Sequence, residues 1–387
     1  MIYLDNNATT RVDGAVLEAM LPFLAEQYGN PSSMHRFGQE ARQAVERGRH
    51  QVAGLLDCEA REVVFTSGAT ESNNAALHGL LAARAPRKVL ITSTVEHSAI
   101  REPAHALAKS GCELVQIPVN RAGALDVDRL AETLAARAAE VALVSVIWAN
   151  NETGVLIDPR PIGELCRRHG VPFHVDATQA VGKIAMSLKG LPIDLLSLSG
   201  HKFHGPKGAG ALFVRRNVRW QPWQRGGPQE RDRRGGTENV AGIVGLGRAA
   251  ELAKAAVEGN AYGRVAELRD RLESQLLAAV PEASVNGGGG DSGKRLPTTA
   301  NISFARLEAE AILLLLSEQG LCASAGAACS SGSLEPSPVI RAMGIPDEIA
   351  HGAIRFSLSR LTTGEEIDAA LGIIPPVIER LRATLPV

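Results

Sequence analysis

Between about residues 50 and 215, short apolar runs alternate with longer stretches in which apolar positions follow a helical period. The apolar runs predict strands at EVVFT, KVLIT, VALVSVI, VPFHV, DLLSLS and GALFV. The amphipathic stretches between them predict helices, for example over residues 71–83, 99–110 and 161–169. This alternation indicates an α/β fold with a mostly parallel sheet and helices on both faces.

The pattern changes after residue 225. The segment RGGPQERDRRGGTENV, residues 225–240, is rich in glycine and charge and predicts a long ordered loop. The following AGIVGLGRAAELAKAAVE predicts a helix that bridges to a second domain. Because single cores stop growing at roughly 250–300 residues, we expect two domains. The large domain covers 15–255, and a smaller α+β domain covers 1–14 and 256–387.

The near-equal numbers of basic and acidic residues limit the kinds of molecule that this protein is expected to bind. Lysine and arginine total 41 against 42 acidic residues, so no strong positive field exists to attract nucleic acid or an anionic membrane. The start MIYLDNNATT lacks the features of a secretory signal, and the run AILLLLS is too short to span a bilayer. We therefore expect a cytoplasmic location and a partner that is a small molecule or a protein.

The five cysteines, at positions 58, 112, 166, 322 and 329, are widely scattered and form no C-x-x-C pair. Their spacing does not fit a disulfide framework or a zinc site, so reduced thiols are expected and no permanent metal is predicted.

Candidate chemistry collects just after the predicted strands, where ligands bind in open parallel sheets. Gly68, Ala69 and Thr70 lie between a strand and a helix and offer free amides for a phosphate. Other strand ends carry His97, Asn151, Asp176 with Gln179, and Ser199 with His201 and Lys202. Taken singly, Thr70 or Asp176 fits a helix cap, and His201 with His204 fits a metal pair.

Together these pieces fit one ligand, pyridoxal 5'-phosphate. Lys202 supplies the amine for a Schiff base, Asp176 holds the pyridine nitrogen protonated, and the turn at Thr70 binds the phosphate. His97 is placed to stack on the ring and move protons. Asn151 is placed to reach the cofactor oxygen or the substrate carboxylate.

The motifs resemble those of cysteine desulfurases in the class V aminotransferase family, which have the type I pyridoxal phosphate fold. The likeness includes YLDNNATT, FTSGATESNN, ANNETG, HVDATQAVGK, SLSGHKFHGPKG, QERDRRGGTENV and ACSSGSLEPS. The residues around Cys329 and the segment SVIWANNETG are more similar to cysteine desulfurases of the nitrogen-fixation type than to those of the housekeeping type.

The resemblance implies specific roles for individual residues. It implies that Lys202 binds the cofactor covalently, that Asp176 holds the pyridinium and that Gln179 bonds the ring oxygen. The phosphate ligands it implies are Ala69, Thr70, Ser199 and His201, with Thr237 contributed by the other subunit of a homodimer. Arg355, in IRFSLS, would grip the substrate carboxylate with its planar guanidinium. Pro228 and Asp232 replace glycines expected in the loop before Thr237.

Cys329 lies among alanines, glycines and serines in a loop over about 322–337, which suits a nucleophile that must move. We expect it to attack the sulfur of substrate L-cysteine and hold that sulfur as a persulfide, while L-alanine leaves. An iron-sulfur scaffold protein, for nitrogenase or general assembly, is the implied acceptor, and the persulfide is a candidate transient iron ligand there. His97 and the substrate amine are both candidate bases for the thiol.

Three alternatives stay open at this point. A selenocysteine lyase or an aminotransferase would use the same cofactor set, and an aminotransferase has no use for Cys329. A binding protein that keeps the cofactor only as a structural element would release no sulfur.

Overall fold

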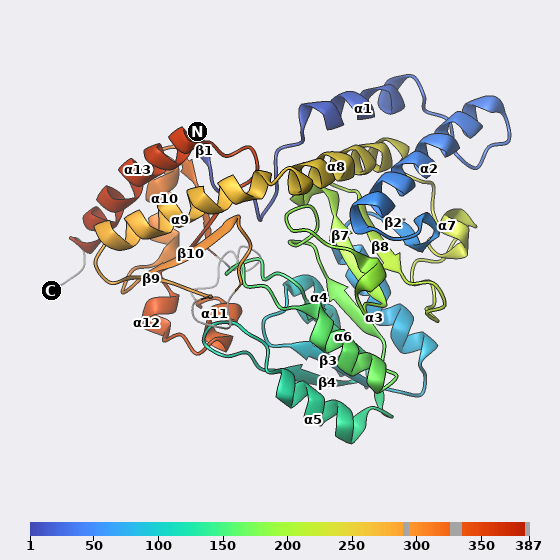
Figure 1. Ribbon diagram of the computed structural model, residues 1–387, viewed down its shortest axis with the longest axis horizontal. Coiled ribbons are helices and arrows are strands. Elements are labelled where there is room, and N and C mark those ends of the chain that lie inside the picture. Colours follow the sequence, from blue (N-terminus) through green and yellow to red (C-terminus); the bar gives the residue numbers. More distant parts are fainter. Residues whose placement is uncertain (289–293, 326–334, 384–387) are drawn as a thin grey trace.

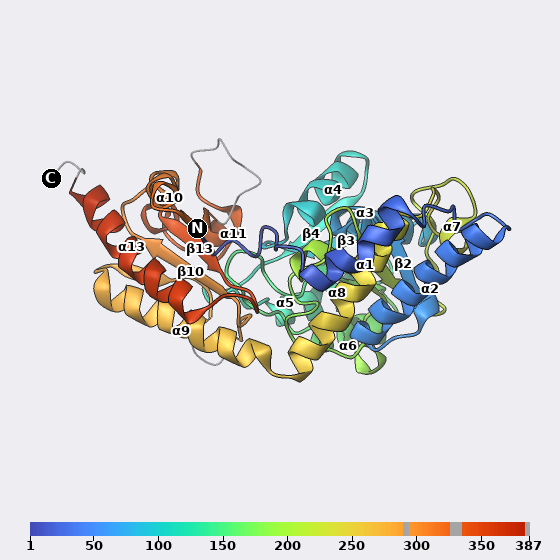
Figure 2. The same cartoon turned by 90° about the horizontal axis from the view of Figure 1, so that it is seen from above.

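The computed structural model describes residues 1–288, 294–325 and 335–383. A larger and a smaller part lie side by side along the longest axis of the molecule (Figures 1 and 2). Helices α8 (Val240–Glu258) and α9 (Ala261–Ala279) follow one another across both parts, and α8 begins where the bridging helix was predicted. No helix in the described ranges is long and apolar enough to cross a membrane.

The larger part is built on a seven-stranded sheet with the order β2-β8-β7-β6-β5-β3-β4. Its strands are β2 (Val63–Thr66), β3 (Val89–Ser93), β4 (Glu113–Ile117), β5 (Val141–Ile147), β6 (Phe173–Asp176), β7 (Leu195–Ser199) and β8 (Gly210–Val214). Strand β8 runs in the opposite direction to the other strands of this sheet. The carboxyl ends of the other strands therefore meet at one edge, and the prediction of a mostly parallel sheet is confirmed.

Helices bury both faces of this sheet, which explains the near-continuous apolar strands. Val63 and Phe65 pack into one apolar cluster, while Val64 between them packs into another. Helices α3 (Ala69–Ala83) and α4 (Ser98–Lys109) join the cluster of Val64. The opposite cluster includes residues from α1 (Gly14–Ala25), α2 (Arg36–Leu56), α5 (Val127–Arg137), α6 (Pro159–Arg168) and α8.

The smaller part contains an antiparallel sheet with the order β12-β13-β10-β9. Its strands are β9 (Ala283–Val285), β10 (Thr299–Phe304), β12 (Ser324–Ala325) and β13 (Ala353–Ser357). Helices α9, α10 (Ala309–Glu318) and α13 (Gly364–Arg382) share its apolar cluster. The short strand β1 (Ile2–Tyr3) pairs with β11 (Leu321–Cys322), so the N-terminal residues pack on this part. The domain boundaries at 14/15 and 255/256 stay a prediction.

The loop predicted over 225–240 is ordered and contains a short turn, α7 (Gln229–Asp232). Glu230, Arg231 and Asp232 all have positive φ angles, of 50°, 60° and 62°. Asp232 thus occupies a backbone region that favours glycine, the residue expected there from the resemblance. Arg49 holds the turn, because its Nη1 and Nη2 each lie 2.7 Å from a carboxylate oxygen of the buried Glu230.

We expect Glu230→Ala to lower the free energy of unfolding by about 3–5 kcal/mol, because it leaves the Arg49 charge buried without its partner. The measurement is the midpoint of urea unfolding. The matched control is Arg231→Ala, which removes an exposed ion pair to Glu46 from the same turn and should cost less than about 1 kcal/mol. Similar losses in both variants would show that the buried pair does not hold this turn.

Candidate functional site

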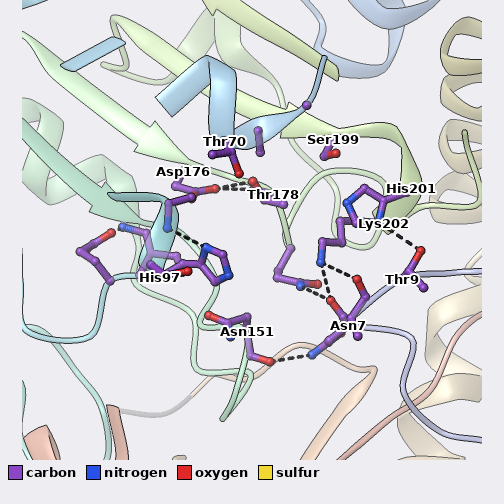
Figure 3. Close-up of a pocket in the computed structure, with 18 of the residues that line it drawn as sticks. Asn7, Thr9, Thr70, His97, Asn151, Asp176, Thr178, Ser199, His201 and Lys202 are labelled. Carbon is purple, nitrogen blue, oxygen red and sulfur yellow. Dashed lines mark hydrogen bonds between the residues drawn. The ribbon is translucent and has the colours of Figure 1, made fainter. Parts of the chain in front are cut away.

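The carboxyl ends of the parallel strands open into a cavity of about 880 Å³ (Figure 3). The sequence-predicted residues that line it are Ala69, Thr70, His97, Asn151, Asp176, Gln179, Ser199, His201, Lys202 and Arg355. The fold therefore brings together groups from five strand ends and from β13 of the smaller part.

One wall of the cavity is an anion seat at the start of α3. Gly68 precedes the helix with φ 155° and ψ 179°, a backbone region open essentially only to glycine. This turn presents the N-terminal amides of the helix to the cavity beside Thr70 and Ser199. Unpaired amides and the positive end of the helix dipole favour a phosphate group.

Asp176 is the last residue of β6 and is buried, with only 2% of its surface exposed. Asn73 Nδ2 donates to its Oδ2 at 2.8 Å, and the backbone N–H of Thr178 donates to its Oδ1 at 3.0 Å. These donors fix the carboxylate in orientation and stabilise its charge away from water.

Lys202 ends the turn after β7, and its Nζ donates to the backbone carbonyls of Asn7 at 2.7 Å and Ala8 at 2.9 Å. Figure 3 shows this amine between Asn7 and the side of the cavity that carries His201. The N-terminal segment thus holds the one lysine that the sequence analysis assigned to covalent chemistry.

His97 is the residue before α4 and caps that helix. The backbone N–H of Ala99 donates to its Nδ1 at 3.1 Å. Burial lowers the pKa of His97, while Asp176 raises it and Lys202 lowers it further. A neutral ring whose Nδ1 accepts a hydrogen bond carries its proton on Nε2, so His97 offers an N–H hydrogen-bond donor.

The two histidines beside Lys202 face different partners. Nδ1 of His201 lies 3.2 Å from Thr9 Oγ1, whereas Nδ1 of His204 lies 2.9 Å from the carbonyl of Arg11. Burial lowers the pKa of each ring to about 4, so both are neutral at pH 7. The described part of the chain contains no cluster of three or more histidine, cysteine or acidic side chains suited to a metal.

Arg355 reaches the cavity from β13. Its Nη2 lies 2.7 Å from Asp5 Oδ1, and its Nη1 donates to the carbonyl of Asn151 at 3.1 Å. Two buried polar atoms here, Arg355 Nε and Asn151 Oδ1, have no hydrogen-bond partner among the described residues. An unpartnered buried polar atom needs an explanation, and a ligand that pairs with it is one such explanation.

The described lining of the cavity does not include two of the predicted site residues. Thr237 is exposed and is not among the described residues that line this cavity, so its assignment to the site of a second subunit stays a prediction. Cys329 falls in 326–334, outside the described residues.

The structure adds cavity residues that the sequence analysis did not assign, chiefly Asn7 and Glu96. Glu96 is 3% exposed, and its Oε1 accepts from the backbone N–H of Ile147 at 3.0 Å and from the hydroxyl of Ser93. Burial raises the pKa of Glu96 to about 8 against the opposing effect of these donors, and Asp176 raises it further. Glu96 is therefore largely protonated at pH 7.

Comparisons with known proteins identify relatives of this chain. The family description "Aminotransferase class-V" matches residues 2–370. Cysteine desulfurase 2 of Trichormus variabilis is 53% identical over 386 residues, covering 100% of this chain and 95% of the relative. The cysteine desulfurase NifS of Azotobacter vinelandii is 50% identical, with 100% and 94% covered. A solved NifS-like protein superposes with a TM-score of 0.91 at 37% identity, over 98% of this chain and 100% of the other.

Glu96 should make stability depend on pH. Its carboxyl has a pKa near 8 in the folded protein and an ordinary value of 4.5, so the folded state retains a proton that the unfolded chain releases. The contribution of the neutral carboxyl is complete below about pH 4.5 and is lost as the pH rises towards 8. We expect Glu96→Gln to flatten the fall in melting temperature over this window and to exceed the wild type in stability at its upper end.

Thermal unfolding at several pH values across this window checks the expectation. Glu132→Gln, on an exposed surface of α5, serves as the control and should follow the wild-type curve. A Glu96→Gln curve parallel to that of the wild type would mean that Glu96 does not hold this proton.

Proposed function

The chain belongs to the class V aminotransferase family, and on this premise we propose that it is a pyridoxal 5'-phosphate-dependent cysteine desulfurase. It converts L-cysteine to L-alanine and transfers the sulfur to one of its own cysteines as a persulfide. The observation that carries the proposal is the convergence of Lys202, Asp176 and the anion seat of α3 on one cavity.

The residues present fit the cofactor. Lys202 offers an amine for the aldehyde, Asp176 a buried carboxylate for the pyridine nitrogen, and the seat beside Thr70 and Ser199 binds a phosphate. The unpartnered Oδ1 of Asn151 leaves an amide available to a ligand. When bound, the cofactor supplies an electron sink for bond changes at the α- and β-carbons of an amino acid.

Arg355 and Asn151 bind the substrate. A guanidinium forms two parallel hydrogen bonds to a carboxylate, and the unpartnered Nε of Arg355 is one donor available for this. Anchoring the carboxylate orients the α-carbon towards Lys202. Asp5 holds the other side of the guanidinium and limits its rotation.

Lys202 moves the α-proton, and His97 donates a hydrogen bond in the cavity. The amine of Lys202, which two backbone carbonyls hold in the cavity, takes the α-proton. His97 donates a hydrogen bond through Nε2, because its Nδ1 accepts from the backbone of α4. Of the two candidate bases for the Cys329 thiol, this arrangement favours the substrate amine over His97.

Cys329 carries the sulfur chemistry. Its thiolate attacks the sulfur of L-cysteine, so that an S–S bond forms while the C–S bond breaks. The electron pair of that bond stays with the carbon skeleton, which gains protons and leaves as L-alanine. The terminal sulfur then passes to an acceptor, an iron-sulfur scaffold protein, where the Cys329 persulfide is a candidate transient iron ligand.

A homodimer completes the proposed site through Thr237 of a second copy. The solvent face of α1 supports this assembly, because it exposes three leucines at helical spacing. Leu17, Leu21 and Leu24 expose 49%, 52% and 61% of their surface, and such a patch is typical of an interface.

We expect Cys329→Ala to bind the cofactor normally and to lose release of alanine and sulfide, because the variant lacks the nucleophile. The assay measures both products from L-cysteine with a reductant. Cys322→Ala is the matched control, because Cys322 lies in β11 near the same segment and has no assigned role. This control should retain turnover.

The alternatives predict different results in the same assay. Full turnover by Cys329→Ala would favour an aminotransferase, or a lyase that does not need this thiol. Normal cofactor absorbance without product from the wild type would favour a binding protein. A higher rate with selenocysteine than with cysteine would favour a selenocysteine lyase.

We expect Arg355→Lys to raise KM for L-cysteine by about tenfold or more, because a lysine forms only a single contact where a guanidinium forms two. Steady-state kinetics give this value. The control is Arg360→Lys, in the loop after β13, where the side chain pairs with Asp13 outside the cavity lining. Equal KM values for the wild type and Arg355→Lys would remove Arg355 from the carboxylate site.

A further inference from the structure

Lys183 is a buried lysine with no role in the proposed chemistry. Its residue exposes 4% of its surface, and it is not among the described residues that line the cavity. Burial lowers its pKa well below the usual value, and the nearby Lys202 and Arg355 lower it further. Burying an amine at such a position costs free energy unless hydrogen bonds to acceptors offset the loss of water.

The amine of Lys183 is committed to two acceptors. Its Nζ donates to Gln179 Oε1 at 2.6 Å and to Asn7 Oδ1 at 3.2 Å. Lys183 follows Gln179 by four residues in a tight turn, and Gly182 at φ 75° shapes that turn. The turn therefore brings the Lys183 amine into contact with the Gln179 side chain.

This contact decides which way the Gln179 amide points. The N–H groups of an amine need an acceptor, and the structure places the amide oxygen of Gln179 towards Lys183. Nε2 must then lie on the other side, where it donates to the carbonyl of Asn7 at 2.8 Å. Gln179 itself lines the cavity, so the atom that it has available for a ligand is an N–H donor.

We propose that Lys183 is a positioning residue that fixes the Gln179 amide with its N–H towards the ring oxygen of the cofactor. The inference rests on the proposed function, because that function places the cofactor ring in this cavity. Without Lys183, only the bond from Nε2 to the Asn7 carbonyl still orients the amide of Gln179, so its N–H is held less firmly towards the ring oxygen.

The same amine steadies Asn7. The side-chain Nδ2 of Asn7 donates to Thr299 Oγ1 at 2.9 Å, and its carbonyl accepts from Lys202 at 2.7 Å. Lys183 therefore orients two neighbours of the cofactor site, and only the path through Gln179 predicts a change at the ring oxygen.

The test uses the purified protein loaded with pyridoxal 5'-phosphate and the variant Lys183→Met, which keeps the side-chain length and has no donor. Loss of one well-directed hydrogen bond should weaken cofactor binding by about tenfold. The pH midpoint of the visible absorbance band should move to higher pH, because the ring oxygen loses a donor that stabilises its anion. Lys189→Met removes the same charge from an exposed site and should change neither value.

A double-mutant cycle with Gln179→Ala separates positioning from a general effect of charge or packing. If Lys183 acts through Gln179, the double variant matches Gln179→Ala in both readouts. Additive effects on the midpoint would overturn the proposal, as would an unchanged midpoint in Lys183→Met. Should Lys183→Met not fold, Lys183→Arg keeps the donors and should keep the wild-type midpoint, and a shifted midpoint there would also overturn it.

Failure of the inference differs from failure of the proposed function. If the wild type forms no visible band with the cofactor, the proposed function fails and the inference fails with it. If the wild type forms the band and Lys183→Met has the same midpoint and affinity, only the inference fails.

Discussion

The hydrogen bonds of Asn7 join the two parts of the molecule at the cavity. Its backbone N–H donates to Ser357 Oγ and its side chain to Thr299 Oγ1, both on strands of the smaller sheet. Its carbonyl accepts from Gln179 and Lys202 of the larger part. Because one residue serves both sides, a shift of the smaller part changes the contacts of the catalytic amine. The arrangement of the site thus depends on a segment that contributes almost nothing to the large core.

Much of the fold was predictable because buried parallel strands leave a strong apolar signal. The elements that sequence analysis did not predict carry weaker signals. Strand β4 is ELVQI, a half-exposed edge strand whose polar residues hide its period. Helix α2 packs on α8 through small residues, and a Cβ at Gly48 would lie 2.9 Å from the carbonyl oxygen of Ile243. A helix that packs through glycine and alanine shows no strong apolar pattern in the sequence, although the packing buries it.

The strand-end residues of the site were also predictable, because parallel topology carries His97, Asp176 and Lys202 to one edge whatever the loops do. The contacts of Asn7 were not predictable, because every residue has a backbone carbonyl and the sequence does not show which one accepts from a lysine. Lys183 was missed because a lysine near a turn is normally solvated, and only its spacing of four from Gln179 hinted at a contact. Roles that depend on a second subunit or on Cys329 rest on the resemblance.

The charges around the cavity explain why so many ionisable groups line it without mutual repulsion. Burial raises the pKa of Glu96 to about 8 and lowers that of His201 to about 4, and it also lowers that of His97. These groups are therefore largely neutral at pH 7, although each still donates or accepts hydrogen bonds. Asp176 and Arg355 place charges of opposite sign in the lining of the cavity. Asp176 and Arg355 are each 2% exposed, and charges at such poorly solvated positions act strongly on a ligand, so Arg355 favours a carboxylate and Asp176 favours a protonated ring nitrogen.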